Sequence, residues 1–458
     1  MNKTNSLFLT EEMLGLATDL YQLSMAAGYF EQGMRDTATF ELSVRHLPEN
    51  RSYLVAAGLE QALHYLTHIT FSPEAIRFLR QLPVFKNVSL SFFESLKDFA
   101  FSGDVYAVPE GTVVFAGEPL LRVTAPLIKA QIVETYLLST INFQTLIATK
   151  AARIAQAAQG REVVDFGSRR AHGPQAGVLA ARASFIGGCK GTSNVFAAYQ
   201  LGIPAVGTMA HAWVMAFESE RDSFRKFHEV FPDNTVLLID TYDTVTGARR
   251  AAAIGKGLKG VRLDSGDLLK LSGEARRILD AEGLHHVRIV ASGDLNEYRI
   301  DELVRDGAAI DSFGVGTEMV TSKDSPALGG VYKLVEQVHG GKVVPRMKCG
   351  SDKATYPCKK QIYRKKDDSG NFREDVIGLE GEAIEGMPLL AQVMKDGKVI
   401  FPLPAIQEIQ DTTLDNLTHL PKPVKRLSNA AVYPVTKSSG LEKKREEAEK
   451  IIALQNSK

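Results

Sequence analysis

The chain has 458 residues, of which 44% are hydrophobic, and its 54 basic and 54 acidic side chains give a formal net charge of zero. A chain of this length is too long to fold around a single hydrophobic core, so two or three domains are predicted. The balanced charge argues against nucleic-acid binding, which needs a basic surface. Three cysteines without a Cys-x-x-Cys pair favour a reducing compartment. Because no leader-like or long apolar segment is present, we expect a cytoplasmic protein that binds no membrane.

The first part of the chain is predicted to be mixed α+β. Alternating apolar residues predict a strand at 37–44, and turn motifs separate shorter strands at 104–108, 112–115 and 120–123. Helical spacing predicts helices at 10–35, from after Gly58 to about His68, at 73–100 and at 127–159. The last of these is predicted to break near 139–142. We therefore expect residues 1–135 to form an N-terminal α+β domain, joined by part of the C-terminal region.

From residue 160, short apolar runs alternate with helix-like segments. The runs lie at 163–166, 185–186, 203–206, 236–239, 261–263, 287–290 and 310–315. This alternation predicts a parallel sheet. Seven runs favour an α/β fold with an irregular (β/α) barrel of about seven strands, spanning residues 136–345. An open doubly wound sheet is the alternative fold, although no Gly-x-Gly-x-x-Gly sequence follows an early strand.

The C-terminal region is predicted to be β-rich and to end in a helix. Two hairpins are predicted at 330–348 and 361–379, each with a glycine-containing turn. Residues 441–455 have the pattern of a charged amphipathic helix, whose charges form a solvated face. We therefore expect a third, C-terminal region at 346–458.

Polar residues follow every one of the seven runs. In the stretch Gly-Thr-Met-Ala-His-Ala-Trp-Val at 207–214, His211 follows a buried run. A lone histidine in such an apolar setting is more often a packing residue than a catalyst. The other runs, however, are followed by a similar set, which includes Arg169, Arg170, Thr192, Ser193, Asp240, Asp243, Asp264, Asp267, Ser292, Asp294 and Thr317. In a (β/α) barrel these positions meet at one mouth, so the functional site is expected there.

The residue types at this mouth indicate a sugar-phosphate or nucleotide substrate. Glycine-rich turns at 187–191, 292–293 and 314–316 would offer backbone N–H groups to phosphate. Carboxylates suit Mg²⁺ or sugar hydroxyls, and arginines bind anions in a bidentate manner. Each glycine turn by itself is also explained as a tight loop, so the prediction depends on their coincidence.

Several of these motifs resemble those of nicotinate phosphoribosyltransferases. The matching sequences are Thr-Asp-Leu-Tyr-Gln-Leu at 18–23, Asp-Phe-Gly-Ser-Arg-Arg at 165–170, Gly-Thr-Ser-Asn at 191–194, Gly-Thr-x-Ala-His at 207–211, Val-Arg-Leu-Asp-Ser-Gly-Asp at 261–267, Gly-Gly-Val-Tyr-Lys-Leu at 329–334 and Pro-Arg-Met-Lys at 345–348. The resemblance implies a type II phosphoribosyltransferase with an irregular barrel, which forms a homodimer with the active site at the subunit interface.

The reaction implied by the resemblance joins nicotinate to phosphoribosyl pyrophosphate and gives nicotinate mononucleotide and pyrophosphate. It is coupled to ATP hydrolysis, as in a ligase, and belongs to NAD biosynthesis from nicotinate by salvage. Mg²⁺ and the co-substrate ATP are implied, without a tightly bound organic cofactor. The expected partners are therefore these small molecules and a second copy of the chain.

The resemblance also implies roles for single residues. His211 would be transiently phosphorylated by ATP, Asp240 would hydrogen-bond its ring, and Asp264 would act near the ribose or the metal. Phe166 and a Tyr21 contributed by the other subunit would stack on the pyridine ring, and Arg169, Thr208 and Arg262 would also contact nicotinate. The residues implied for the phosphoribosyl group are Arg170, Ser193, Ser292, Gly293, Asp294, Gly316 and Thr317. The implied Mg²⁺ ligands are Asp264 and Asp294.

Two other functions fit parts of the pattern. A nicotinamide phosphoribosyltransferase would share the barrel and the histidine, but would carry an acid suited to the neutral amide where this chain has Ser193. A non-catalytic metabolite-binding relative is a second alternative, and the presence of His211, Asp240 and Asp264 argues against it. The Asp240–Gly247 segment only superficially resembles the acidic loop of type I phosphoribosyltransferases, because its second position is Thr241.

Overall fold

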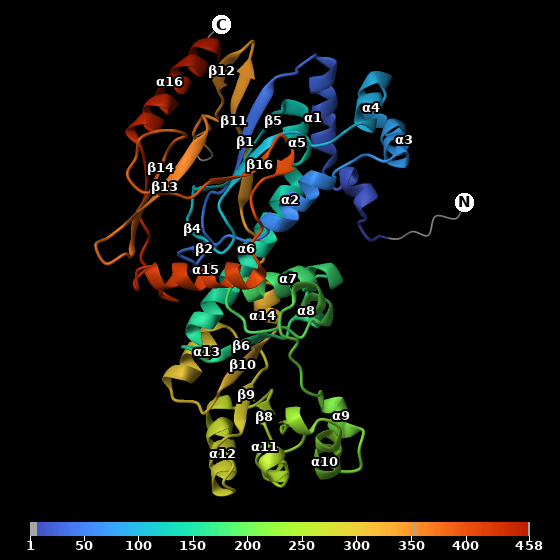
Figure 1. Ribbon diagram of the computed structural model, residues 1–458, viewed down its shortest axis with the longest axis vertical. Coiled ribbons are helices and arrows are strands. Elements are labelled where there is room, and N and C mark those ends of the chain that lie inside the picture. Colours follow the sequence, from blue (N-terminus) through green and yellow to red (C-terminus); the bar gives the residue numbers. More distant parts are fainter. Residues whose placement is uncertain (1–6, 351–353, 457–458) are drawn as a thin grey trace. The chain divides into compact units, whose positions relative to one another are not determined.

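The computed structural model describes residues 7–350 and 354–456 (Figure 1). Contacts between residues divide the chain into two compact units. The first unit contains residues 1–145, 327–405 and 415–458, and the second contains residues 146–326 and 406–414. Among the described helices, none combines the length and the apolar composition needed to span a bilayer.

A seven-stranded antiparallel sheet forms the centre of the first unit, in the order β12-β11-β1-β5-β3-β16-β17. β1 (Thr37–Val44) has the bounds predicted from its alternating residues, and it pairs with β11 on one side and β5 on the other. Phe40 stacks on Tyr332 across the sheet, with ring centroids 4.9 Å apart. The other strands are β3 (Asp104–Ala107), β5 (Pro119–Pro126), β11 (Gly330–His339), β12 (Lys342–Pro345), β16 (Ala391–Lys395) and β17 (Lys398–Val399).

Two smaller sheets and several helices complete the first unit. The two-stranded sheet pairs β2 (Leu54–Val55) with β4 (Val113–Val114), and the four-stranded sheet contains β15 (Met387–Pro388), β13 (Lys360–Lys366), β14 (Phe372–Leu379) and β18 (Val435–Lys437). The helices are η1 (Glu11–Leu16), α1 (Leu20–Glu31), α2 (Leu59–His68), α3 (Pro73–Gln81), η2 (Pro83–Phe85), α4 (Leu90–Lys97), α5 (Leu127–Ile132) and α16 (Ser439–Asn456). The long helix predicted at 127–159 breaks at Val133, not near 139–142, because α6 (Glu134–Ala157) begins directly afterwards.

A buried group of charged residues lies where the four-stranded sheet contacts the two-stranded sheet, since Arg364 Nη2 donates to the Val113 carbonyl of β4 at 2.8 Å. Arg364 forms three hydrogen bonds with Asp375, from Nε to Oδ1 at 3.0 Å, from Nε to Oδ2 at 3.2 Å and from Nη2 to Oδ2 at 2.6 Å, and both side chains are fully buried. Glu118 is also fully buried and accepts a hydrogen bond from the Phe115 backbone N–H at 2.8 Å. Burial, and then the neighbouring Asp375 carboxylate, raise the pKa of Glu118 well above its usual value. The raised pKa of Glu118 favours its protonated form beside the Arg364–Asp375 ion pair.

We expect Glu118→Gln to become more stable relative to the wild type as the pH rises from 5 to 8. Because the folded pKa of Glu118 is raised, its contribution to stability is complete below the unfolded pKa and is lost as the pH rises towards the folded pKa. Glutamine keeps the neutral state, so the stability difference should grow by up to about 1.4 kcal/mol per pH unit. Thermal unfolding at several pH values measures this. Asp375→Asn is the control and should be destabilised at every pH by about 3–5 kcal/mol, because it leaves Arg364 unpaired. An equal effect of Glu118→Gln at all pH values would contradict a protonated Glu118.

The second unit contains the parallel sheet predicted from the alternating runs. Its order is β6-β10-β9-β8-β7, and every pair is parallel. Neighbouring residues such as Leu237 and Leu238 point to opposite faces, and both are fully buried, so both faces are covered. The strands are β6 (Glu162–Asp165), β7 (Val236–Leu238), β8 (Gly260–Leu263), β9 (Arg288–Ala291) and β10 (Ser312–Val315). The prediction of a mixed α/β fold with a parallel sheet is therefore confirmed.

Two of the seven predicted strands differ in the structure. Residues 185–186 form the end of α7 (Pro174–Ile186), so a strand there was a wrong prediction. The run at 203–206 forms only one bridge, in which Ala205 pairs with Thr192, and Thr192 in turn pairs with Asp165 of β6. A short apolar run does not distinguish a strand from a buried helix end, which explains the error. The hydrogen bonds of the described residues form an open row, and they do not close a barrel.

Helices follow the strands of this sheet and have well-defined ends. They are η3 (Ser168–Arg170), α7, α8 (Val195–Leu201), α9 (His211–Met215), α10 (Glu220–Val230), η4 (Pro232–Asn234), α11 (Thr244–Ala252), η5 (Gly255–Gly257), α12 (Leu268–Ala281), α13 (Glu297–Arg305) and α14 (Thr317–Val320), together with parts of α6 and α15 (Ile406–His419). Asp243 and Asp267 accept hydrogen bonds from backbone N–H groups at the starts of α11 and α12. Both acids therefore act as N-caps, and this role explains their positions after the strands without requiring that they bind a ligand.

Candidate active site

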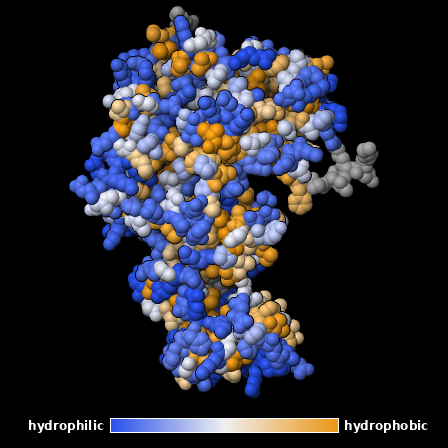
Figure 2. Space-filling view, viewed as in Figure 1, coloured by the Kyte–Doolittle hydropathy of each residue, from blue (hydrophilic) through white to orange (hydrophobic). Residues whose placement is uncertain are grey.

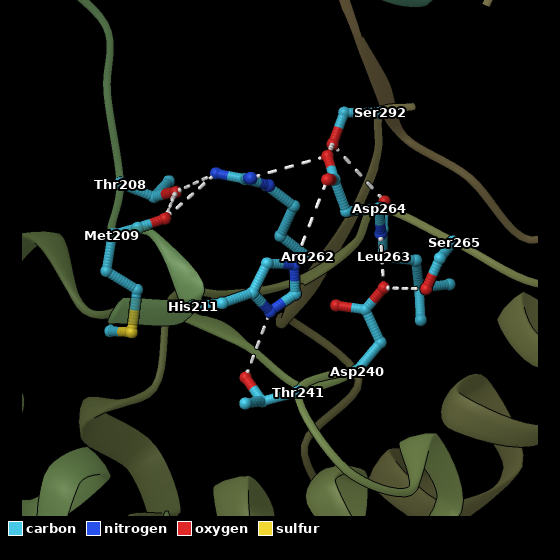
Figure 3. A network of polar contacts seen from close by, with 10 residues as sticks. All are labelled: Thr208, Met209, His211, Asp240, Thr241, Arg262, Leu263, Asp264, Ser265 and Ser292. Carbon is cyan, nitrogen blue, oxygen red and sulfur yellow. Dashed lines mark hydrogen bonds and ion pairs between the residues drawn. The ribbon is translucent and has the colours of Figure 1, made fainter. Parts of the chain in front are cut away.

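The candidate active site lies at the carboxyl ends of the parallel strands of the second unit. Asp264 directly follows β8, Ser292 directly follows β9, and Asp240 comes two residues after the end of β7. Because the strands are parallel, their carboxyl ends all lie at the same edge of the sheet. Figure 3 shows that side chains from these segments point toward one another and toward His211, the first residue of α9.

Arg262 lies at the centre of the polar network. Its Nη1 donates to Thr208 Oγ1 at 2.7 Å and to the Met209 carbonyl at 3.1 Å, and its Nη2 lies 3.4 Å from Asp264 Oδ1 (Figure 3). The guanidinium carbon is 5.9 Å from the centroid of the Phe166 ring. A guanidinium has five N–H donors, so these three contacts leave one Nη2–H for a ligand, while the Nε–H is buried without a hydrogen-bond partner among the described residues. A cation is thus held beside an aromatic ring, with its orientation fixed from two sides.

Asp264 is ionised in this environment. Burial alone would raise its pKa, but the Ser292 hydroxyl, the Arg262 charge and His211 together hold the pKa of Asp264 below its usual value. Ser292 donates its hydroxyl hydrogen to Asp264 Oδ1, and Asp264 Oδ2 lies 3.9 Å from His211 Nε2. A fixed negative charge therefore faces the histidine and the neighbouring space.

The His211 ring is held on one side only. Its Nδ1 lies 3.1 Å from Thr241 Oγ1, whereas the distance of 3.9 Å from Nε2 to Asp264 is too long for a hydrogen bond. The side chain is 39% exposed, and Nε2 has no hydrogen-bond partner among the described residues, so Nε2 is the ring nitrogen left for a ligand. His211 is therefore not a core packing residue, which was the simpler explanation of its apolar sequence context.

Asp240 does not contact His211 as the family resemblance implies. Its Oδ2 accepts hydrogen bonds from the Asp264 backbone N–H at 2.9 Å and from Ser265 Oγ at 2.6 Å. Its Oδ1 is buried without a hydrogen-bond partner among the described residues and lies on the His211 side of the carboxyl group (Figure 3). In this structure Asp240 therefore fixes the turn that carries Asp264, and Thr241 takes the place next to the ring.

Two glycines allow the loops of the site to approach closely. Gly293 has a φ of +89°, and a Cβ on it would lie 2.0 Å from the Asp264 carbonyl oxygen. A Cβ on Gly314 would lie 2.3 Å from the Phe166 ring, so any larger residue would displace that ring. Both positions thus require glycine for packing, independently of any contact with phosphate.

The remaining predicted residues make no side-chain contact with this network among the described residues. Arg169 and Arg170 are exposed in the short 3₁₀ helix after β6, and Asp294 is exposed with a φ of +43°. The backbone N–H of Ser193 donates to the Asp165 carbonyl at 2.8 Å, and Gly316 and Thr317 begin α14. Tyr21 belongs to the first unit, where it lies on α1 and is half exposed.

Sequence reasoning missed two residues that shape the site. Thr241 contacts the histidine ring, and its position directly after Asp240 was the available signal. Asp165 is buried at the end of β6, where its carboxylate accepts from the Gly167 N–H at 2.8 Å and from Thr192 Oγ1 at 2.7 Å. Burial raises the pKa of Asp165, and these two hydrogen bonds oppose that shift. Asp165 therefore shapes the turn that presents Phe166 and Arg169.

These features define a mixed α/β protein with a charged candidate active site at the carboxyl ends of a parallel sheet. The sequence matches three family models, which are the nicotinate phosphoribosyltransferase N-terminal domain over residues 16–142, the nicotinate phosphoribosyltransferase family over residues 161–373, and the nicotinate phosphoribosyltransferase C-terminal domain over residues 382–445. The chain belongs to the nicotinate phosphoribosyltransferase family.

Individual relatives agree with this assignment over nearly the whole chain. A nicotinate phosphoribosyltransferase of Mycobacterium tuberculosis is 43% identical over 92% of this chain and 91% of its own length. The Bacillus subtilis nicotinate phosphoribosyltransferase is 39% identical over 93% of each chain. The crystal structure of human nicotinic acid phosphoribosyltransferase is similar with a TM-score of 0.84 at 29% identity, covering 94% of this chain and 99% of the human one.

Proposed function

We propose that the protein is a nicotinate phosphoribosyltransferase, which forms nicotinate mononucleotide and pyrophosphate from nicotinate and phosphoribosyl pyrophosphate. The observation that carries the proposal is the pairing of Arg262 with the Phe166 ring. Thr208 and Asp264 hold the guanidinium 5.9 Å from the ring centroid, so a flat aromatic acid can stack on Phe166 while its carboxylate contacts Arg262. In the cell this reaction would supply NAD biosynthesis by salvage of nicotinate.

The chemistry requires a bond from the pyridine nitrogen to the ribose carbon that loses pyrophosphate. Positive charge develops on the ribose as the carbon–oxygen bond to pyrophosphate breaks. Asp264 is ionised and fixed by Ser292 and Arg262, so its negative charge can stabilise this state with little reorganisation. The exposed Arg169 and Arg170, Ser193, the turn at 292–294 and residues Gly316 and Thr317 would contact the phosphates of the substrate.

His211 is the proposed phosphoryl acceptor from ATP. Its Nε2 would attack the terminal phosphorus of ATP, a nitrogen–phosphorus bond would form, and ADP would leave. Water would later hydrolyse this bond. With Nδ1 next to Thr241 and Nε2 accessible, the ring has one free nucleophilic nitrogen when Nδ1 carries the proton.

Asp264 and Asp294 would hold Mg²⁺, which would neutralise charge on the pyrophosphate. Both offer carboxylate oxygens, the ligands that Mg²⁺ prefers, and both side chains are at least partly exposed. The donor set therefore fits the ion. No tightly bound organic cofactor is proposed.

A homodimer with the active site at the interface would bring Tyr21 of the partner subunit to the pyridine ring. Tyr21 is 50% exposed, as a stacking residue requires. Helix α8 also presents Val195, Phe196 and Tyr199 to solvent, and Figure 2 shows hydrophobic residues at the surface where Figure 1 labels α8. Such exposed apolar side chains favour a surface that is covered by another protein chain.

The irregular barrel and the three domains at 1–135, 136–345 and 346–458 stay predictions. The cytoplasmic location also stays a prediction, and the free thiols of Cys189, Cys349 and Cys358 would suit it.

An assay of pyrophosphate release tests the proposed function. Purified protein with Mg²⁺, phosphoribosyl pyrophosphate and nicotinate is expected to release pyrophosphate, and faster when ATP is added. Nicotinamide and quinolinate are the matched substrates. Turnover with either of them but none with nicotinate would contradict the assignment. Tight binding of nicotinate with no turnover of any of the three would favour a metabolite-binding protein. Ser193, an uncharged residue after Gly191 and Thr192, supports the expectation that the acid is preferred to the amide.

A further inference from the structure

Two histidines and a glutamate converge on the surface of the first unit. Glu11 is the first residue of η1, and His64 and His68 lie on α2. One donor atom from each of the three residues lies within 4.8 Å of the other two, and all three side chains are exposed. Glu11 Oε1 is 3.3 Å from His64 Nε2, and the two imidazole rings have centroids 4.2 Å apart.

The sequence of α2 explains why both histidines point the same way. Residues four apart lie on one face of a helix. Leu59, Ala62, Leu63 and Leu66 are buried, which leaves His64 and His68 on the solvent side. Two histidines at this spacing can bind one metal ion, as in helical zinc sites. The position of η1 then supplies the carboxylate from a distant part of the chain.

A backbone contact within α2 orients the His68 ring. Its Nδ1 lies 2.8 Å from the His64 backbone carbonyl, which can only accept a hydrogen bond. Thr67 Oγ1 lies 2.9 Å from the same nitrogen. In the neutral tautomer that donates to the carbonyl, the lone pair is on Nε2. Metal-binding histidines show this arrangement, in which a backbone carbonyl fixes the tautomer and orients the ring.

We propose that Glu11, His64 and His68 form a binding site for a divalent transition metal of the Zn²⁺ class. Tetrahedral Zn²⁺ with bonds of about 2.0–2.1 Å needs ligand atoms roughly 3.3 Å apart. The Glu11–His64 pair already has this separation. The donor atom of the exposed His68 side chain lies within 4.8 Å of the other two and would have to move closer when the ion binds. Two imidazoles exclude a preference for Mg²⁺, which selects oxygen ligands.

The site differs from the proposed active site in position and chemistry. Its three residues belong to the first unit, whereas His211, Asp240 and Asp264 belong to the second. A bound ion would link η1 to α2, and α1 with Tyr21 begins four residues after η1 ends. The proposal does not depend on the proposed function, so the two are tested separately.

Calorimetric titration of the full chain with ZnCl₂ tests the site. The protein carries no histidine tag, is treated with a chelator first, and is kept in excess Mg²⁺ so that carboxylate sites elsewhere are occupied. We expect one Zn²⁺ to bind per chain at micromolar concentration and to raise the unfolding temperature. His68→Ala and Glu11→Gln should each weaken this binding by at least about tenfold. His286→Ala removes an exposed histidine of the second unit and should have no effect.

Two results would overturn the proposal. The first is the absence of stoichiometric Zn²⁺ binding by the wild type. The second is Zn²⁺ binding that His68→Ala and Glu11→Gln leave unchanged, because the ion would then occupy another part of the chain, such as the exposed Cys349. Since all three side chains are exposed, neither variant is expected to prevent folding, and circular dichroism verifies this.

Discussion

His211→Ala is expected to remove the stimulation by ATP and the labelled phosphate that ATP leaves on the protein. The physical reason is that Nε2 of His211 is the accessible nucleophilic nitrogen of the polar network, while Thr241 occupies Nδ1. The slow reaction without ATP should persist, because Arg262, Phe166 and Asp264 are unchanged. The measurement is retention of label from γ-labelled ATP, which should be stable in base and lost in acid as for a phosphohistidine.

Thr241→Val is the matched variant for this experiment. It keeps the histidine and removes the hydroxyl that contacts Nδ1. One such hydrogen bond contributes about 1 kcal/mol, so the rate of labelling should fall by roughly fivefold and not disappear. If His211→Ala retains the label, a different residue accepts the phosphate. If Thr241→Val loses the label completely, Thr241 contributes more to phosphorylation of His211 than one hydrogen bond explains.

The sequence predicted the elements of the site better than their contacts. Alternation of apolar runs and helices was sufficient for the five parallel strands, because strands buried on both faces have short continuous apolar runs. The same signal failed at 185–186, where two apolar residues end α7. The residue that pairs with the outer side of β6 is Thr192, which forms a single β-bridge with Asp165. Its hydroxyl also donates to the Asp165 carboxylate at 2.7 Å. A polar residue that pairs through one bridge leaves no apolar pattern to detect.

The hydrogen-bond partners of the site residues depend on local geometry, which the spacing of residues in the sequence does not show. Asp240 accepts hydrogen bonds from Asp264 and Ser265, so Thr241 is next to the His211 ring. The site of Glu11, His64 and His68 shows a similar limit. The spacing of the two histidines is visible in α2, but the approach of Glu11 results from tertiary packing of η1.

Lys150→Met is expected to lower kcat/KM for phosphoribosyl pyrophosphate by at least about tenfold, with a smaller change in KM for nicotinate. Lys150 lies on α6 and is almost fully buried, with its Nζ 2.7 Å from Glu297, 2.9 Å from Asp324 and 3.8 Å from Glu318. Glu297 begins α13, directly after the loop that carries Ser292 and Asp294. Glu318 lies in α14, which follows Gly316. One ammonium group therefore connects the two loops proposed to hold the phosphates.

Lys150 is a positioning residue in this interpretation, because it acts through the loops. Glu297 is fully buried and keeps its pair with Arg153 at 3.1 Å. Removing Lys150 takes away the ammonium group that Glu297 shares with Glu318 and Asp324, so these three carboxylates are left with less positive charge. Breaking a buried ion pair from one side costs about 3–5 kcal/mol. The loops can reduce that cost by moving Glu297 and Glu318 toward water, which would displace Ser292 and Gly316. Lys150→Arg keeps the charge and should restore most of the affinity for phosphoribosyl pyrophosphate.

Lys323→Met is the control, because Lys323 also pairs with Glu318, at 3.1 Å, but its side chain is 65% exposed. A surface pair of this kind contributes at most about 1 kcal/mol, so kcat/KM should stay within severalfold of the wild type. Assays run well below the unfolding temperature of each variant separate positioning from stability. If Lys150→Met unfolds at a lower temperature but keeps the wild-type kcat/KM for phosphoribosyl pyrophosphate, the network of Lys150 supports the fold only, and the geometry of the two loops must be fixed by their glycines and helix caps.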